Sequence, residues 1–482
     1  MTLPPGLLAD LRAAVGEAHV WTDPAQIAPH EVEDRGRWKG HALAVVRPAT
    51  TDEVAAVVRL CHAARVPMVP QGGNTGLVGG GVPDGAVVIA MGRMNRIRAI
   101  DPLNATLTVE AGCTLAAIQT AADDAGQLFP LSLASQGSCQ IGGNLSTNAG
   151  GTAVLRYGTT RDLVLGIEAV LPSGEVLNTL SALRKDNTGY ALRDLMIGAE
   201  GTLGIITAAV LRLFPRPATT VTAMAACEGP EQALAIFDIL RARCGDSLTA
   251  FEYIERFGIQ MVLDHLPGAR DPLADPHPAY VLIELTSPDP DAGLDARMER
   301  ALAQAMEDGL IPDAVIAASQ TQAQALWSLR ENMSEMQKHA GASIKHDVAV
   351  PVSRVADFIT QGVAACRAHM PDVRPCPFGH FGDGNIHFNL TRPAAMTDAD
   401  FLAHYGAFNR IVHDLVADMG GSISAEHGIG LAKRDELPLY KDRVALALCR
   451  TIKAAIDPDN LMNPGKVIVL HDTASRPLER IA

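Results

Sequence analysis

Two histidines and an aspartate stand close together in a glycine-rich stretch of the chain, Pro375 to Leu390. His380 and His387 flank a Gly-Asp-Gly-Asn sequence of the kind that reverses a chain between two strands. Such a reversal brings both imidazoles together, as a metal site requires. An ordinary hairpin whose histidines point into solvent fits the same residues, so a metal site needs a further ligand from elsewhere in the chain.

A carboxylate and a third imidazole stand side by side at Glu426 and His427, within the segment Ser424 to Gly430. Two histidines and a glutamate are a ligand set suited to zinc or a similar divalent ion, with one position left open for substrate. His380, His387 and Glu426 therefore form a candidate metal site. On this reasoning alone His427 has no role.

The composition of the chain narrows the classes of partner and the compartment. Its 482 residues are enough for two or three domains, and the 40 basic and 54 acidic residues give a formal charge of -14. This acidity argues against nucleic acid or an anionic membrane surface as the main partner. No apolar run approaches the roughly 18 residues of a membrane-spanning helix, and the N-terminus lacks the pattern of a signal peptide, so we expect a cytoplasmic protein.

The eight cysteines are spread along the chain without a Cys-x-x-Cys pair. This spacing indicates neither an iron–sulfur cluster nor a disulfide framework. We expect the cysteines to be reduced and mostly structural.

Helix and strand signals lead into a first glycine-rich loop. Residues Thr50 to Glu53 form a capping box, and apolar residues then recur at helical spacing from Val54 to Cys61. A short strand, Pro67 to Pro70, follows and leads directly into Gln71 to Gly81, the most glycine-dense segment of the chain. The sequence thus predicts a helix, a strand and then a loop.

Two further glycine-rich loops cover Ser135 to Gly151 and Gly198 to Gly204, and the latter leads into an apolar strand, Ile205 to Phe214. Glycine-rich loops often make only turns. Three of them together suit a nucleotide cofactor, because consecutive backbone N–H groups can reach pyrophosphate oxygens without side-chain obstruction. No Gly-Lys-Ser/Thr follows, as a Walker loop requires, and the first loop lacks the Rossmann pattern, so the binding mode is a different one.

Beyond Pro217 the chain alternates between strands and amphipathic helices. This indicates an α+β or α/β second domain with a boundary near Arg216. We expect strands at Thr222–Cys227, Tyr280–Leu285 and Ile344–Val350, and helices at Glu231–Arg243, Gly293–Glu307 and Gln320–His339.

Six motifs occur together and in one order along the chain. They are Pro70-Gln-Gly-Gly-Asn-Thr-Gly-Leu77, Gly137-Ser-Cys-Gln-Ile-Gly-Gly-Asn144 with Thr147-Asn-Ala-Gly-Gly151, Gly198-Ala-Glu-Gly-Thr-Leu-Gly-Ile-Ile206, the His380/His387 loop, Ser424–Gly430 and Asn463-Pro-Gly-Lys466. From about residue 40 to about residue 470 the chain resembles the FAD-linked D-2-hydroxyacid dehydrogenases of the vanillyl-alcohol-oxidase-like flavoprotein superfamily, and it is most similar to their D-2-hydroxyglutarate branch.

This resemblance implies an α+β fold with a PCMH-type FAD-binding domain of two subdomains over residues 1–216, its core starting at about residue 40. A substrate (cap) domain with the metal loop would cover residues 217–420, and a C-terminal segment, residues 421–482, would return to complete the FAD site and the active site. FAD would be bound non-covalently, because Gln71 to Gly81 contains no histidine for the covalent attachment found in some relatives. The residues implied to contact FAD are Pro70, Gln71, Gly72, Gly73, Asn74, Thr75, Gly76, Leu77, Ser135, Gly137, Ser138, Gly142, Gly143, Asn144, Thr147, Asn148, Ala149, Glu200, Gly201, Ile206 and Asn463.

The resemblance also implies the chemistry of the site. Oxidation of a 2-hydroxy acid removes a hydride to the flavin and a proton from the hydroxyl group. A metal that lowers the pKa of bound water from roughly 15.7 to about 7 can also acidify a coordinated alcohol. His380, His387 and Glu426 are the implied ligands, with zinc the expected ion although manganese and cobalt share its chemistry, and His427 is the implied base. Asp383, in the turn, is interpreted as structural or as a support for a ligand.

Positions that match the family also point to substrate contacts. Arg330 and Ser334 are four residues apart in a predicted helix and so would share one face, and Lys345 begins the next predicted strand. Asn389 lies two residues after His387, which places both on one face of a strand. Without the resemblance, Arg330 and Lys345 would be solvated surface charges. The residues implied to bind substrate are Arg330, Ser334, Lys345, Asn389 and His427.

The favoured function is oxidation of D-2-hydroxyglutarate to 2-oxoglutarate, because these cations and hydroxyl groups exceed what one carboxylate demands. D-Lactate, D-malate and glycolate dehydrogenases of the same family are alternatives. A zinc-dependent hydrolase is a rival of another class, but it leaves three phosphate-type loops unexplained, and a catalytically dead flavin-binding scaffold conflicts with the presence of every proposed ligand and base. The electron acceptor, for which an electron-transfer flavoprotein, a quinone or a partner subunit would fit, and the assembly state, with a homodimer among the options, are left open.

Overall fold

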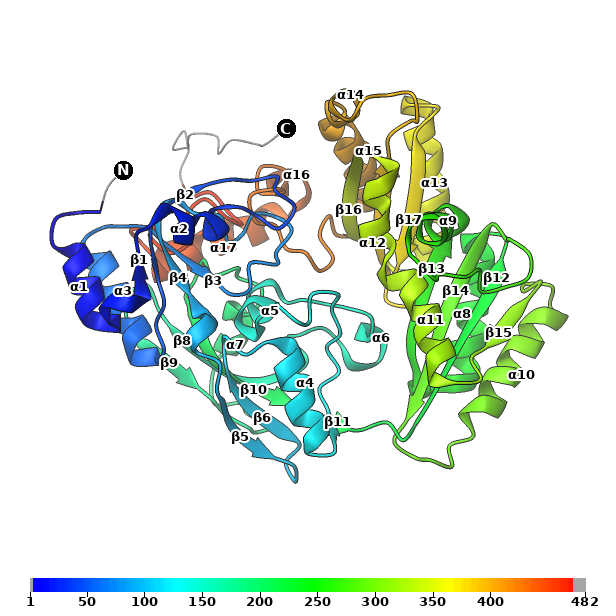
Figure 1. Ribbon diagram of the computed structural model, residues 1–482, viewed down its shortest axis with the longest axis horizontal. Coiled ribbons are helices and arrows are strands. Elements are labelled where there is room, and N and C mark those ends of the chain that lie inside the picture. Colours follow the sequence, from blue (N-terminus) through cyan, green and yellow to red (C-terminus); the bar gives the residue numbers. More distant parts are fainter. Residues whose placement is uncertain (1–2, 471–482) are drawn as a thin grey trace. The chain divides into compact units, whose positions relative to one another are not determined.

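The computed structural model describes residues 3–470, and these residues form two compact units (Figure 1). The first unit comprises residues 3–149, 159–215 and 426–470, and the second unit comprises residues 150–158 and 216–425. Helices accompany predominantly antiparallel sheets in both units, so the predicted α+β class is confirmed.

The first unit begins with a small sheet whose strands, in spatial order, are β1 (Val20–Trp21), β2 (His41–Val46), β4 (Asp84–Ala90) and β3 (Met68–Gln71). Strand β4 pairs in parallel with both β2 and β3. At the start of α3 (Thr51–Ala63) the predicted N-cap is present, because Thr50 Oγ1 accepts the N–H of Glu53 at 3.1 Å. The Glu53 side chain accepts the N–H of Ala49 at 2.8 Å, one residue before the position that a capping box requires. Helices α1 (Leu7–Val15) and α2 (Pro24–Glu31) complete this part.

A second sheet of the first unit is antiparallel throughout. Its strands, in spatial order, are β5 (Ile97–Asp101), β6 (Thr106–Glu110), β10 (Ile205–Arg212), β8 (Val164–Val170) and β9 (Val176–Thr179). Strand β10 confirms the apolar strand predicted after the third glycine-rich loop. The other elements of this unit are α4 (Leu115–Asp124), α5 (Ile141–Thr147), α7 (Leu192–Met196), α16 (Leu437–Tyr440), α17 (Arg443–Ile456) and the paired strands β7 (Gln127–Leu128) and β11 (Phe214–Pro215).

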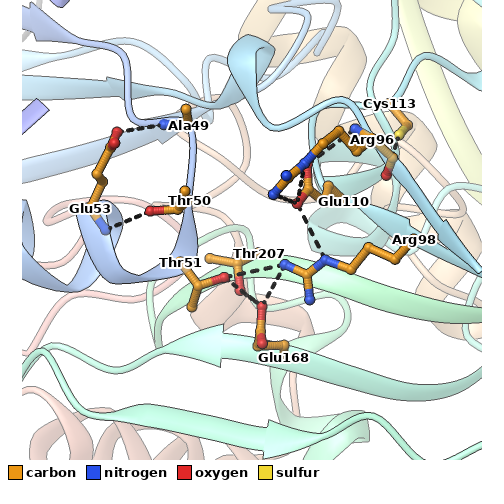
Figure 2. A network of polar contacts seen from close by, with 10 residues as sticks. All are labelled: Ala49, Thr50, Thr51, Glu53, Arg96, Arg98, Glu110, Cys113, Glu168 and Thr207. Carbon is orange, nitrogen blue, oxygen red and sulfur yellow. Dashed lines mark hydrogen bonds and ion pairs between the residues drawn. The ribbon is translucent and has the colours of Figure 1, made fainter.

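A network of ion pairs and hydrogen bonds connects α3 to this antiparallel sheet (Figure 2). The buried carboxylate of Glu110 accepts from Arg96 at 2.9 Å and from Arg98 at 3.3 Å. Glu168 accepts from the same Arg98 at 3.1 Å and from the hydroxyl group of Thr51 at 2.5 Å. Because Thr51 is the first residue of α3, the network attaches the start of this helix to three strands of the sheet, β5, β6 and β8.

The second unit is built on one seven-stranded antiparallel sheet between two layers of helices (Figure 1). One layer is α8 (Pro230–Cys244), α10 (Leu294–Glu307), α13 (Val355–His369) and α15 (Tyr405–Asp418), and the other is α9 (Arg256–His265), α11 (Gln320–Glu331) and α12 (Met333–Met336). Short helices α6 (Val154–Tyr157) and α14 (Asp398–Leu402) also belong to this unit. The strands, in spatial order, are β15 (Ala314–Ile316), β12 (Thr219–Cys227), β14 (Ala279–Ser287), β13 (Leu248–Glu255), β17 (Arg374–Gly379), β18 (Asn385–Thr391) and β16 (Ser343–Ala349).

Alternation along the central strand β13 determines which side chains each helical layer covers. Phe251 and Tyr253 belong to the apolar core shared with α8 and α13, whereas Ile254 belongs to the core shared with α9 and α11. Successive side chains of a strand point to opposite faces, so Glu252 lies on the same side as Ile254. We call the side of the sheet covered by α9, α11 and α12 the α11 face.

Most of the elements predicted for the second unit are confirmed, but one helix is wrong in length. The three predicted strands and the helices near residues 231–243 and 293–307 are present, with small shifts at their ends. The helix predicted over Gln320–His339 ends at Glu331, with Asn332 as its C-cap. The side-chain amide of Asn332 donates to the carbonyl oxygen of Ser328 at 2.8 Å, a local hydrogen bond of the kind that competes with helix continuation.

The second glycine-rich segment, predicted as a loop, contains a helix. Residues Ile141–Thr147 form α5, and both Ile141 and Leu145 are fully buried. These two apolar residues stand four apart, at helical spacing, but the glycines and polar residues around them conceal the pattern in the sequence.

The longest helices of the described chain are α8 and α13, with 15 residues each. Within residues 3–470, no helix is both long enough and apolar enough to cross a membrane.

Candidate active site

Four non-glycine residues in the predicted FAD motifs have left-handed backbone conformations. They are Asn74 (φ 54°), Asn148 (φ 52°), Glu200 (φ 50°) and Asn463 (φ 44°). Such conformations cost on the order of 1–3 kcal/mol each and persist only where the surrounding structure fixes them. Each of the four motifs is therefore held in a shape that a free loop would not adopt.

The first and second glycine-rich loops of the first unit touch each other. A Cβ atom at Gly73 would clash with the carbonyl oxygen of Ser138, so this position requires glycine. A Cβ atom at Gly72 would lie 3.4 Å from the Cβ of Gln140, which is ordinary contact. Two loops predicted to bind the pyrophosphate thus lie backbone against backbone.

Asn463 ties the C-terminal segment to the first and third glycine-rich loops. Its buried side-chain amide donates to the carbonyl oxygens of Glu200 at 2.7 Å and Gly80 at 3.0 Å. Its backbone N–H donates to the carbonyl oxygen of Met68 at 2.7 Å. Since Met68 is the first residue of β3, the C-terminal segment is also attached to the strand that precedes the first loop.

The carboxylate of Glu200 binds the C-terminal segment next to the predicted base. It accepts the N–H of Ile429 at 2.6 Å and that of Gly430 at 2.9 Å, and the side chain is buried. Burial raises the pKa of Glu200 to about 7, although the two N–H groups and Lys433 oppose this rise. His427 stands two residues before Ile429, so the chain beside the predicted base is hydrogen-bonded to a motif predicted to bind FAD.

In the second unit, the predicted chain reversal between His380 and His387 is confirmed. Strands β17 and β18 pair antiparallel, and the two imidazole centroids are 5.5 Å apart. The side chains of His380 and His387 are only 7% and 14% exposed, so the alternative of two solvent-facing histidines is wrong. In the turn, Asp383 accepts the N–H of Asn385 at 3.0 Å, a structural contact of the kind expected for it.

Glu252 on β13 bridges the first of these histidines to an arginine. Its Oε1 lies 2.7 Å from Nδ1 of His380, and its Oε2 accepts the Nε–H of Arg330 at 2.6 Å, with all three side chains buried. Burial disfavours the charged carboxylate, but His380 and Arg330 outweigh this effect and lower the pKa of Glu252 to about 2. An ionised carboxylate accepts the proton-bearing Nδ1–H, which leaves Nε2 of His380 as the nitrogen suited to a metal.

Two cross-strand pairs extend this polar surface along the α11 face. In the ladder of β16 and β18, Lys345 is opposite Asn389 and Asp347 is opposite His387. Directly opposed side chains share a face, and on the other flank His387 is opposite Phe378, which belongs to the core of the α11 face. The prediction that Asn389 shares a strand face with His387 is confirmed. Asp347 Oδ1 lies 3.8 Å from Nδ1 of His387.

Comparison with known proteins connects this geometry to a family. Residues 42–180 match the family described as FAD binding domain, and residues 216–467 match FAD linked oxidases, C-terminal domain. The D-2-hydroxyglutarate dehydrogenase of Xanthomonas citri pv. viticola is 39% identical over 466 residues, which cover 96% of this chain and 97% of that protein. This chain belongs to the FAD-linked D-2-hydroxyacid dehydrogenases.

Other relatives agree in sequence and in fold. The mitochondrial D-2-hydroxyglutarate dehydrogenase of Bos taurus is 39% identical over 454 residues, covering 94% of this chain and 81% of that protein. The solved structure of p-cresol methylhydroxylase with substrate bound has a TM-score of 0.77 at 18% identity, covering 98% of this chain and 99% of that chain. An alkyldihydroxyacetonephosphate synthase structure has a TM-score of 0.74 at 18% identity, covering 96% and 84%. These two likenesses show the PCMH-type fold.

The residues that this FAD-linked dehydrogenase offers for its cofactor all belong to the first unit. The predicted FAD motifs are joined by the contact of Gly73 with Ser138, by the Asn463 amide, and by the N–H of Glu200, which donates to the carbonyl oxygen of Ser146 at 2.8 Å. Close-packed loops rich in glycine present N–H groups without side-chain obstruction, as a pyrophosphate requires. The loops therefore fit FAD, and the roles of the single residues stay predictions.

Among the predicted substrate residues, the structure separates Arg330 from Ser334. Arg330 is buried near the end of α11, whereas Ser334 is exposed on α12. The prediction that they share one helix face is wrong because α11 ends between them. The carbonyl oxygen of Ser334 instead accepts from Nζ of Lys345 at 3.3 Å, which makes these two residues neighbours.

The polar residues of the α11 face that are not among the predicted ones include Glu252, Asp347 and Gln337. The buried Gln337 accepts the side-chain amide of Asn389 at 2.9 Å. The strand Leu248–Glu255 is not among the predicted elements, but the sequence carries a signal for Glu252, because this acidic residue stands between Phe251 and Tyr253 in a mainly apolar segment. Buried acidic residues are rare unless paired, so such a residue merits attention.

Proposed function

We propose that this dehydrogenase oxidises D-2-hydroxyglutarate to 2-oxoglutarate and that the reaction depends on FAD and on a divalent metal, expected to be zinc. The observation that carries the substrate assignment is the 39% identity to the Xanthomonas citri pv. viticola D-2-hydroxyglutarate dehydrogenase over nearly the full length of both chains. The two cations of the α11 face, Arg330 and Lys345, also support the assignment, because the two carboxylates of a diacid need more than one cationic partner.

The proposed metal ligands are His380, His387 and Glu426. When bound, the metal would acidify the hydroxyl group of the substrate. The contact between Glu252 and Nδ1 of His380 supports this assignment, because metal-binding histidines commonly give their other ring N–H to a carboxylate. The closeness of the two imidazole rings, with centroids 5.5 Å apart, supports it as well.

Chain connectivity supports Glu426 as the third ligand. The N–H of Ala425 donates to the carbonyl oxygen of Asp347 at 3.3 Å. Asp347 is the cross-strand partner of His387, and Glu426 follows Ala425 directly in the chain. Glu426 is therefore the residue next to Ala425, whose N–H is hydrogen-bonded to the cross-strand partner of His387.

His427 is the proposed base that takes the hydroxyl proton at a ring nitrogen. An unperturbed imidazole titrates at about pH 6.5, so a neutral histidine can accept a proton near neutral pH. Nε2 of His427 lies 3.9 Å from Oε1 of Glu426, and a neighbouring carboxylate stabilises the imidazolium that forms. FAD supplies the hydride acceptor when it is bound.

Arg330 and Lys345 are the proposed cations for the substrate carboxylates. Glu252 takes the Nε–H of Arg330, so the terminal NH2 groups would bind the substrate. The guanidinium lies over the ring of Phe378, 4.9 Å from its centroid, which limits the orientations of the arginine. Lys345 and Asn389 would add polar contacts on the same face as His387.

Steady-state kcat/KM values for D-2-hydroxyglutarate, D-malate, D-lactate and their L-enantiomers, with an artificial electron acceptor, test the substrate. A short monoacid would leave buried polar groups without partners at a cost of about 1–3 kcal/mol each. We therefore expect D-2-hydroxyglutarate to exceed D-lactate by roughly ten- to a hundredfold, with D-malate at or below D-2-hydroxyglutarate. D-Lactate equal to or better than both diacids would place the enzyme in the D-lactate or glycolate branch.

We also propose an electron-transfer flavoprotein or a quinone as the physiological acceptor, and a homodimer as the assembly. Replacing the artificial acceptor by each candidate in the same assay tests the first part. Light scattering of the purified protein tests the second.

A further inference from the structure

We infer that Glu200 is a positioning residue whose carboxylate holds the segment from Glu426 to Gly430, and with it the proposed base His427, against the FAD-binding loops. This inference rests on the proposed function for the role of His427. It extends that function, because it assigns the Glu200 side chain to the C-terminal segment and not to the cofactor. All the residues involved belong to the first unit.

The carboxylate makes both of its strong contacts with this segment. One oxygen accepts the N–H of Ile429 at 2.6 Å and the other accepts the N–H of Gly430 at 2.9 Å, and Glu200 is only 7% exposed. Each carboxyl oxygen thus accepts one N–H group of the same segment, at a normal or short hydrogen-bond distance. Two adjacent N–H groups bound to one carboxylate fix the orientation of the segment as well as its distance.

The segment also fits closely around the carboxylate. Gly428 has φ 86°, and a Cβ atom at this position would lie 2.7 Å from Oε1 of Glu200. Both the backbone conformation and the lack of space therefore favour glycine there. His427 immediately precedes Gly428, so its Cα is one residue from the contact.

The backbone of Glu200 is fixed by other segments of the cofactor site. Its N–H donates to the carbonyl oxygen of Ser146 at 2.8 Å, and its carbonyl oxygen accepts the amide of Asn463 at 2.7 Å. A Cβ atom at Gly80 would lie 3.2 Å from Oε2, which places the first glycine-rich loop beside the carboxylate too. Glu200 is thus in contact with the three predicted FAD segments that contain Ser146, Asn463 and Gly80, and its carboxylate binds the segment that carries His427. The position of His427 therefore depends on these three segments.

Hydrogen–deuterium exchange of the holoenzyme tests the contact without any substrate. In Glu200→Gln one acceptor oxygen is replaced by an NH2 group, and in Glu200→Ala both acceptors are lost. We expect peptides covering residues 428–431 to exchange faster, by roughly ten- to a hundredfold and more in the alanine variant. Unchanged exchange of these peptides in both variants would overturn the inference.

Two further variants separate this contact from a general loss of stability. Glu110→Gln removes a charge from another buried carboxylate of the same unit, and it should leave exchange at residues 428–431 at the wild-type value. Gly428→Ala keeps the Glu200 carboxylate but crowds it from the other side, so it should accelerate exchange of the same peptides. Equal acceleration in Glu110→Gln and Glu200→Gln, or none in Gly428→Ala, would contradict the inference.

Flavin reduction reports whether the contact positions the base. We expect Glu200→Gln to keep a wild-type ratio of FAD to protein and to lower the rate of flavin reduction by about 10- to 100-fold, because a shift of about 1 Å in a reacting group can cost that much. The KM for the hydroxy acid should change less than the rate of flavin reduction, since the proposed substrate cations, unlike His427, belong to the second unit. If wild-type flavin is reduced by no 2-hydroxy acid, the proposed function fails, whereas the exchange result still decides the contact.

Discussion

His427 carries the proposed proton transfer, and the residues around it define how it can be tested. Removing its imidazole in His427→Ala leaves the FAD motifs and the proposed metal ligands intact. We expect kcat to fall by about 10²- to 10⁴-fold, the usual contribution of general acid–base catalysis, with FAD and metal contents unchanged. His41→Ala, which alters an exposed histidine of the same unit, is the control. Flavin reduction at the wild-type rate in His427→Ala would exclude the role.

Glu252 is expected to hold His380 in the form that binds metal. In Glu252→Gln the Nδ1–H of His380 loses its ionic acceptor and Arg330 loses its partner. Loss of such a supporting group typically lowers metal affinity by about 10- to 100-fold, which competition with a chelator measures. The control is Glu284→Gln, because Glu284 is a half-buried carboxylate of the same sheet that accepts from Trp327 at 2.8 Å. Equal metal affinity in wild type and Glu252→Gln would contradict this role.

At the scale of residues, local sequence predicts a pair but not its long-range partners. The Gly-Asp-Gly-Asn turn predicts that His380 and His387 meet, because a tight reversal between strands leaves few other arrangements. Glu252 stands 128 residues before His380, and only strand order places β13 beside β17. That order depends on how the whole sheet packs, so spacing in the chain carries no signal of the contact.

At the scale of elements, the ion pairs of Figure 2 attach α3 to the antiparallel sheet. Glu110→Gln weakens the contacts with Arg96 and Arg98, and we expect a loss of about 1–3 kcal/mol in stability at pH 7, because both arginines lose their anionic partner and keep only an uncharged amide oxygen. Thermal unfolding measures the change as a fall in Tm. Asp238→Asn, which removes an exposed partner of Arg241, should leave Tm within error.

The same carboxylate gives a pH dependence with a definite sign. Burial would raise the pKa of Glu110, but hydrogen bonds from Arg96 and Arg98 outweigh it and hold this pKa below the ordinary 4.5. A carboxyl group with a lowered pKa stabilises the fold above its unfolded pKa, and this contribution is lost as the pH falls through the folded pKa. The Tm difference between wild type and Glu110→Gln should therefore be full at pH 7 and shrink below about pH 4. A difference independent of pH would contradict this account.

Periodicity predicts most elements because it reports which side of a helix or strand is buried. The helix from Thr51 and the strands of the second unit follow this rule. It fails at Asn332, where a side chain competes for helix hydrogen bonds, and at Ile141–Thr147, where glycines hide a short apolar pattern. Both failures lie in segments predicted to bind substrate or FAD. At such sites, residues required for binding replace those that would give a regular helix or strand pattern.

At the scale of the whole molecule, the proposed cofactors depend on different parts of the chain. The predicted FAD residues belong to the first unit, whereas two of the three proposed metal ligands, His380 and His387, belong to the second, and Glu426 is not among the predicted FAD residues. Chelation should therefore abolish turnover while FAD stays bound, and adding zinc should restore activity. Full turnover by metal-free protein, verified by elemental analysis, would falsify the metal assignment.

The division into units is only partly visible in the sequence. Near Arg216 the sequence changes to alternating strand and amphipathic-helix patterns, and this change coincides with the start of the longer segment of the second unit. Residues 150–158 also belong to this unit, because Arg156 donates to the carbonyl oxygen of Thr286 at 2.8 Å and Leu155 packs on the apolar core. This segment of nine residues contains too few apolar positions to show a periodicity. Only its packing against the second unit identifies it as part of that unit.

Anaerobic mixing of the purified holoenzyme with D-2-hydroxyglutarate tests the central claim most directly. The flavin absorbance band should bleach in a single turnover, and one equivalent of 2-oxoglutarate should form per FAD, because the hydride leaves the substrate for the flavin. D-Lactate should reduce the flavin more slowly, by roughly ten- to a hundredfold. A flavin that stays oxidised with D-2-hydroxyglutarate but bleaches with D-lactate would contradict the proposed function.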